Sequence, residues 1–136
     1  MSDQPIRAEI VWDGALQFIA NAGDHETRMD GERRTGGTPM ELLMAALAGC
    51  MGMDLVYILG RMRSELKSMR AQIEGVRADS YPQRFIALSL HFEISGADID
   101  AADVDRAIAL SRETYCSVYA SLRPDIDMKI TYKLTG

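Results

Sequence analysis

The segment TPMELLMAALAGCMGMDLVYIL, residues 38–59, decides the fold of this chain. Thr38 and Glu41 have the spacing of a capping box, and Pro39 suits the first turn of a helix. The rest of the segment is apolar or small on every helical face except at Asp54. A helix of this composition is typically enclosed by protein instead of lying on a surface.

The helix is predicted to continue to about Arg63. Its 18 residues from Leu42 to Leu59 approach the length of a membrane span. Asp54 and the interior glycines Gly49 and Gly52 favour a buried core helix instead. A helix that is apolar all round needs cover on both sides, and one sheet covers one side. We therefore expect a second subunit to supply the rest.

Runs of alternating apolar and polar residues flank this helix and predict strands with one wet face. They cover residues 6–12, 16–20 and 25–30 before the helix, and 69–74, 86–94 and 126–134 after it. Asp100 or Asp103 can cap a second helix, and a shorter helix is predicted from Cys116 to Leu122. This order indicates the α+β class, with helices against a curved antiparallel sheet in a single domain, residues 1–136.

The charge balance limits the partners of the chain. Its 136 residues include 20 Asp and Glu against 15 Lys and Arg, a net charge of −5, which argues against binding to nucleic acid or to an anionic membrane. Asp3, Arg7, Glu9 and Asp13 interrupt any apolar signal segment, so a cytoplasmic location is expected. Two cysteines are too few for a disulfide scaffold, which leaves packing or redox chemistry.

Cys50 lies inside the apolar helix, next to Gly49 and two residues before Gly52. Each interior glycine costs roughly 0.5 to 1 kcal/mol relative to alanine, and such small residues admit another backbone or leave room beside the sulfur. An inert buried cysteine is the other interpretation. A thiol in mid-helix needs a cation from elsewhere to become a thiolate. The candidates are Arg28, Arg33 and Arg34 in the preceding loop.

Cys116 lies near the start of the short predicted helix, with Arg112 one turn earlier. A helix N-terminus and a nearby cation both favour a thiolate. These features predict Cys116 as the sulfur of lower pKa.

Other polar residues give weaker signals. Asp54 lies on the same helical face as Cys50, and we expect it either to orient an arginine or to hydrogen-bond a neighbouring backbone group. His25 and His91 have no ligand spacing with the cysteines, so no metal site is expected.

Two segments carry a family resemblance: Thr38–Cys50, with Pro-x-Glu-Leu-Leu leading to Gly-Cys, and Tyr115–Val118. They resemble the OsmC and Ohr family of osmotically inducible and organic hydroperoxide resistance proteins, and the similarity extends over nearly the whole chain. The resemblance implies an OsmC-like fold, with curved antiparallel sheets on a long central helix. It also implies an intertwined homodimer with active sites at the subunit interface.

The resemblance further implies a thiol peroxidase without a bound cofactor. Cys50 would attack an organic hydroperoxide and become a sulfenic acid, and Cys116 would resolve it as a disulfide. A dithiol such as a lipoyl group would reduce the disulfide by exchange.

An activating arginine is also implied. Residues 28–33 look like the family's Arg-x-acidic-Gly-Glu-Lys stretch, which makes Arg28 the first choice. Two extra residues before Pro39 leave Arg33 and Arg34 as substitutes.

One position departs from the family pattern. Efficient hydroperoxidases of the family carry a glutamate directly after the proline, where it holds the arginine, and this chain has Met40 there. Glu41 is the acidic candidate for that role, but it is shifted by one residue, about 100° around a helix. Slower activity or a different substrate is therefore expected, as in a branch of the family with Pro-Met-Glu-Leu-Leu.

The leading hypothesis is an OsmC-type peroxidase that acts on small organic hydroperoxides in defence against oxidative stress. One alternative is a binding or sensor protein for hydrophobic small molecules, in which Met44, Met53 and Tyr57 line a pocket between subunits. Another is a redox-inactive dimerisation module.

Overall fold

The computed structural model describes residues 4–136 of the chain. These residues gather into two units that divide between Leu43 and Met44, within a long helix. The single domain over residues 1–136 stays a prediction, and residues 1–3 lie outside the described part.

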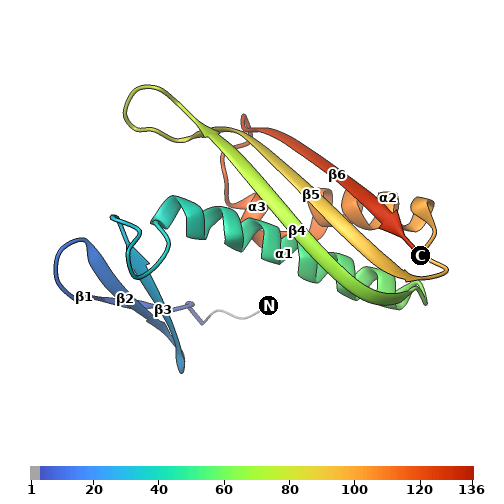
Figure 1. The fold of residues 1–136 in the computed structure, drawn as a ribbon, viewed down its shortest axis with the longest axis horizontal. Coiled ribbons are helices and arrows are strands. Elements are labelled where there is room, and N and C mark those ends of the chain that lie inside the picture. The colour runs from blue at the N-terminus through green and yellow to red at the C-terminus, as the bar shows by residue number, and fades with distance from the viewer. Residues whose placement is uncertain (1–3) are drawn as a thin grey trace. The chain divides into compact units, whose positions relative to one another are not determined.

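The first unit contains a three-stranded antiparallel sheet (Figure 1). Its strands, in order of pairing, are β1 (Glu9–Trp12), β2 (Gln17–Ala22) and β3 (His25–Asp30). The two turns between these strands use Gly14 and Gly23, which have positive φ angles of 91° and 59°. The first strand begins at Glu9 instead of Ile6. Glu9 pairs with Asn21, and β2 extends only one residue further, so it is too short to pair with residues 6 and 7.

Asp30 fixes the loop that follows this sheet. Its buried carboxylate accepts backbone N–H groups from Glu32, Arg34 and Thr35 at 2.8, 3.2 and 3.0 Å, and also the Thr35 hydroxyl at 3.0 Å. The N–H group of Glu32 is the main reason that the pKa of Asp30 is lowered. Residues 31–37 are therefore wrapped around one carboxylate.

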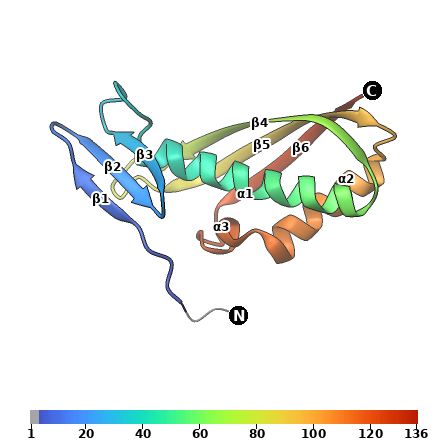
Figure 2. The ribbon, with the colours of Figure 1, turned by 90° about the horizontal axis from the view of Figure 1, so that it is seen from below.

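The second unit is a three-stranded sheet with helices gathered on one face (Figure 2). Its strands, in order of pairing, are β4 (Glu65–Arg77), β5 (Phe85–Ala97) and β6 (Asp127–Thr135). Its helical segments are α1 (Pro39–Arg61) from Met44 onward, α2 (Ala101–Leu110), the π-helical η1 (Ser111–Tyr115) and α3 (Ser117–Ala120). The α+β class is confirmed, and Asp100 is the residue that caps α2.

The long helix ends two residues before the predicted position. Arg63 has a left-handed φ of 62°, and the N–H group of Ser64 donates to the carbonyl of Leu59 at 3.0 Å. This geometry terminates a helix by turning the chain back over its last carbonyl groups. α1 therefore stops at Arg61, and β4 begins directly afterwards at Glu65.

One strand pair differs from the predicted antiparallel sheet. β4 and β5 are antiparallel, but β6 runs parallel to β5. The connection between β5 and β6 contains α2, η1 and α3. A crossover of this kind returns the chain to the end of the sheet where β5 began, so β6 must run in the same direction.

The core lies between one face of α1 and the inner face of β5. The buried residues of α1 are Leu47, Ala48, Met51, Leu55, Ile58 and Leu59. Leu88, Leu90, Phe92 and Ile94 alternate with more exposed residues on β5, as the pattern predicts. Gly52 also faces the sheet, since a Cβ atom there would make van der Waals contact with Cε1 of Phe92 at 3.9 Å.

The opposite face of α1 is apolar and exposed. Met53, Val56 and Tyr57 are 74%, 48% and 67% exposed. By length and composition alone, Pro39–Arg61 could cross a membrane. The core helix of a soluble protein meets the same test, so this property is weak support for a span.

A prediction concerns Gly96 of β5. A Cβ atom at this position would run into the backbone carbonyl oxygen of Glu65, beside the register shift between β4 and β5. We expect Gly96→Ala to lower the free energy of unfolding by about 1–3 kcal/mol, measured as a lower urea midpoint. The control is Gly60→Ala in α1, where a Cβ atom meets nothing within 4 Å and helix propensity favours alanine. A Gly96→Ala midpoint equal to that of the wild type would contradict the prediction.

Candidate functional site

Three side chains from two parts of the second unit meet in one place. One ligand atom each of Cys50, Asp54 and Cys116 lies within 4.8 Å of the other two. Cys50 and Asp54 are one helical turn apart on α1, so they share a face. Both cysteines are free; Cys50 is half-buried and Cys116 is only 3% exposed. The cysteines that are 66 residues apart in sequence are therefore neighbours in space.

The π-helical segment η1 brings Cys116 to this place. The N–H group of Cys116 donates to the carbonyl of Ser111 at 2.8 Å, which closes the wider turn. Cys116 then caps α3, and its sulfur accepts the N–H group of Tyr119 at 3.3 Å. Single π-helical turns are rare and frequently mark functional sites.

Ser111 also holds Asp54. Its hydroxyl donates to Oδ2 of Asp54 at 2.8 Å, and Ser111 itself is buried. The sequence left an arginine or a neighbouring backbone group as the partner of Asp54, and the structure adds a third kind of partner. The partner is a side-chain hydroxyl, because η1 places Ser111 opposite this turn of α1.

Cys116 is not the sulfur of lowered pKa that its sequence position predicted. Burial raises its pKa to about 11, and the hydrogen bond from the Tyr119 N–H group offsets only part of this rise. Cys50 and Asp54 raise it further. The prediction failed because α3 has only four residues and because Arg112 lies over the Tyr119 ring, 5.8 Å from its centroid.

The loop arginines have acidic partners within the first unit. Arg28 donates to Oδ2 of Asp13 at 2.9 Å and to Oε1 of Gln17 at 3.3 Å. Arg33 forms an ion pair of 2.8 Å with Glu41, and Arg34 forms one of 3.2 Å with Glu32. The activating role of Arg28 stays a prediction.

Glu41 forms the predicted capping box. It accepts the N–H group of Thr38 at 2.9 Å, and the Thr38 hydroxyl accepts the N–H group of Glu41 at 3.2 Å. The Thr38 N–H group, followed by the charge of Arg33, lowers the pKa of Glu41. Glu41 therefore caps α1 and holds Arg33 with the same carboxylate.

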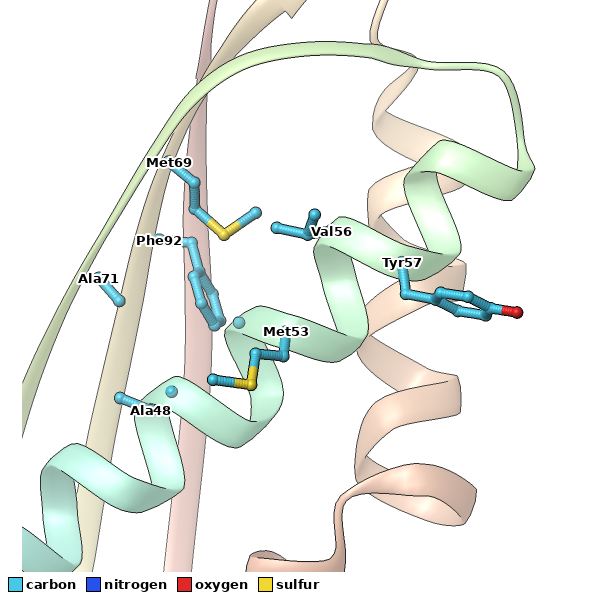
Figure 3. Close-up of a pocket in the computed structure, with 9 residues that line it drawn as sticks. Ala48, Met53, Val56, Tyr57, Met69, Ala71 and Phe92 are labelled. Carbon is cyan, nitrogen blue, oxygen red and sulfur yellow. The ribbon is translucent and has the colours of Figure 1, made fainter. Parts of the chain in front are cut away.

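An apolar groove of about 510 Å³ lies between α1 and the sheet (Figure 3). Met53 and Tyr57, two of the predicted pocket residues, are among the residues that line it, but Met44 is not. Figure 3 shows Met53, Met69 and Phe92 directed toward a common space and the Tyr57 ring directed away from it.

A second groove, of about 630 Å³, includes Asp54 and two arginines, Arg61 and Arg106. Neither arginine was among the residues predicted from the sequence. Arg61 lies seven residues after Asp54, on the same helical face, and that spacing could have identified it. Arg106 and Ser111 gave no such signal, because only the tertiary fold brings α2 and η1 to α1.

Comparisons with known proteins agree with this architecture. The family model for "OsmC-like protein" matches residues 30–131. Protein YhfA of Escherichia coli strain K12 is 31% identical over 133 residues, which cover 96% of this chain and 99% of YhfA.

Solved structures share the fold. A hypothetical protein from Aquifex aeolicus VF5 superposes with a TM-score of 0.89 at 25% identity, over 97% of each chain. The organic hydroperoxide resistance protein OhrB of Bacillus subtilis superposes with a TM-score of 0.64 at 17% identity, over 97% of this chain and 100% of OhrB. At that identity OhrB shows the fold alone. By the family match and the likeness to YhfA, the chain belongs to the OsmC-like protein family.

Proposed function

We propose that this protein is a thiol-dependent peroxidase that reduces small organic hydroperoxides in the cytoplasm. Membership of the OsmC-like family and the fold shared with an organic hydroperoxide resistance protein support redox chemistry of the peroxidase type. The observation that carries the proposal is the proximity of the two sulfurs, which lie within 4.8 Å of each other. Disulfide formation would bring them to the S–S bond length of about 2.05 Å.

The chemistry proceeds in three balanced steps. The Cys50 thiolate attacks the outer oxygen of the hydroperoxide, the O–O bond breaks, and an alcohol leaves after taking up a proton. The resulting sulfenic acid condenses with the Cys116 thiol, which forms the disulfide and releases water. An external dithiol, such as a lipoyl group, then reduces the disulfide by exchange and becomes a disulfide itself.

The environments of the two sulfurs support this division of roles. Cys116 is buried, and its raised pKa keeps it as a thiol at neutral pH. Cys50 is half-buried on α1 and is the more accessible of the two. A thiol that stays protonated until a sulfenic acid forms beside it is suited to resolution.

Each candidate for the activating guanidinium is paired with an acidic residue. Arg33 is fixed by Glu41 at 2.8 Å, whereas Arg28 is bound to Asp13. Within this proposal Arg28 is the first candidate, which the family resemblance favours, and Arg33 and Arg34 are its substitutes. A guanidinium would stabilise both the thiolate and the charge that develops on the leaving oxygen.

We also propose that the chain works as a homodimer of OsmC-like domains, each formed by residues 1–136. The exposed apolar face of α1 supports this proposal, because it leaves Met53, Val56 and Tyr57 uncovered in the single chain. Neither Cys50 nor Cys116 lines the two grooves around α1, so a partner subunit would complete the space for the substrate.

The catalytic roles can be tested by mass spectrometry after one equivalent of cumene hydroperoxide. The wild type should lose two hydrogens per chain, since an intramolecular disulfide forms. Cys116→Ser should gain one oxygen on Cys50, trapped by dimedone, because attack proceeds without resolution. Cys50→Ser should stay unmodified and should lose all turnover, whereas a binding or sensor protein would retain its ligand affinity. An unmodified wild type would refute the peroxidase.

The order of reactivity can be tested by alkylation of the reduced protein with iodoacetamide. Near neutral pH, Cys50 should react and Cys116 should not, because the pKa of Cys116 is raised to about 11. The alkylation rate of Cys116 should rise roughly tenfold per pH unit below that pKa, since only the thiolate reacts. Peptide mapping gives the rate of each cysteine. Equal rates at neutral pH would remove the basis for the assigned roles.

The dimer can be tested with a matched pair of surface substitutions. Val56→Glu puts a charge on the exposed face of α1, and Val76→Glu puts the same charge on a valine of β4; these side chains are 48% and 58% exposed. Light scattering after size exclusion should show a dimer for the wild type and Val76→Glu, and a monomer for Val56→Glu. A monomeric wild type, or a dimeric Val56→Glu protein, would contradict the assignment of this face.

A further inference from the structure

The reduced site has the composition of a metal centre. Cys50, Asp54 and Cys116 offer two sulfurs and one carboxylate oxygen, all within 4.8 Å of one another. Zinc takes thiolate ligands at about 2.3 Å and carboxylate ligands at about 2.0–2.2 Å. In a tetrahedral complex such ligands are about 3.5–3.8 Å apart. Small rotations of three side chains would therefore bring these atoms to a common ion.

The residues around the cluster orient it as the outer groups of a metal site do. The Ser111 hydroxyl donates to Oδ2 of Asp54 at 2.8 Å, which leaves the other carboxylate oxygen available. The N–H group of Tyr119 donates to the sulfur of Cys116 at 3.3 Å. Hydrogen bonds of this kind fix the direction of ligands and tune their affinity for the metal.

The cluster also offers negative charge to a cation. Among residues 4–136 no lysine, arginine or histidine forms an ion pair with Asp54, and the two thiols add negative charge when a metal displaces their protons. Two soft sulfurs favour zinc, whereas magnesium and calcium prefer sets of oxygen ligands.

The cluster also has a path to solvent. Cys50 and Asp54 are only half-buried, and Asp54 lines the groove of about 630 Å³. Three protein ligands leave a fourth position on zinc for water.

We propose that Cys50, Asp54 and Cys116 bind one zinc ion in the reduced protein. The proposal does not depend on peroxidase turnover, since zinc binding needs only the two thiolates and the carboxylate. A disulfide removes both thiolates, so the metal-bound state and the oxidised state exclude each other. Binding releases the two thiol protons to solvent, and oxidation by a hydroperoxide would release the ion.

The experiment titrates the reduced full-length chain with Co²⁺, a spectroscopic substitute for zinc. We expect one equivalent to bind, with thiolate-to-cobalt charge-transfer absorption and the d–d bands of a tetrahedral ion, and Zn²⁺ to abolish both signals. Absence of charge-transfer absorption in the wild type, or binding that survives full alkylation of both cysteines, would overturn the proposal.

Substitutions test whether Co²⁺ binds at this cluster or at carboxylates on the surface. Asp54→Asn and Cys116→Ser should each weaken Co²⁺ binding at least about tenfold, and Ser111→Ala should weaken it by about 10–100-fold through the loss of its hydrogen bond. The matched control Asp127→Asn, an exposed residue of β6, should bind as the wild type does. Circular dichroism verifies that each variant is folded. If a folded Asp54→Asn protein binds Co²⁺ as tightly as the wild type, the site is wrong.

A second measurement distinguishes this proposal from the peroxidase proposal. Saturating Zn²⁺ should slow oxidation of the wild type by cumene hydroperoxide at least about tenfold, followed as free thiols per chain. Unchanged oxidation with zinc bound would overturn the assignment of the cysteines as ligands and leave the peroxidase intact. If the thiols resist the peroxide even without zinc, the peroxidase fails, and the cobalt titration still decides the metal site.

Discussion

The packing of α1 against β5 is the interaction on which the second unit depends. Leu47, Met51 and Leu55 of α1 and Phe92 of β5 are almost completely buried. This packing fixes the rotation of α1 about its axis, because these three side chains must face the sheet to stay buried. With that rotation fixed, Cys50 and Asp54 lie beside η1. Ser111 of η1 and the following Cys116 complete the site.

The site that results holds two thiols and one carboxylate, and the carboxylate also lines a groove with Arg61 and Arg106. Burial, Cys50 and Asp54 raise the pKa of Cys116, so its thiol loses a proton less readily. Asp54 is held by the neutral hydroxyl of Ser111. Chemistry that removes or compensates negative charge is favoured in such a place, and both disulfide formation and cation binding do so. The loop arginines are instead organised by carboxylates of their own unit, with Glu41 joining the start of α1 to Arg33.

Periodicity predicted the elements well, and tertiary contacts account for what it missed. The sequence predicted the capping box of Thr38 and Glu41, the exposed and buried faces of β5, and the Asp100 cap. Each of these features depends on residues close in sequence. The parallel direction of β6 could not be predicted, since apolar and polar residues alternate in the same way in parallel and antiparallel strands. The Ser111 to Asp54 bond and the raised pKa of Cys116 depend on residues up to 66 positions apart, so local rules assigned them incorrectly.

The parallel pairing of β5 and β6 also places half of the site on a connection. Ser111 and Cys116 lie on the crossover between these two strands, whereas Cys50 and Asp54 lie on α1. The crossover is anchored at one end by β5 and at the other by β6. Loss of the β6 pairing would therefore free one end of the segment that carries Cys116, and Cys50 would keep its place on α1 without a fixed second sulfur beside it.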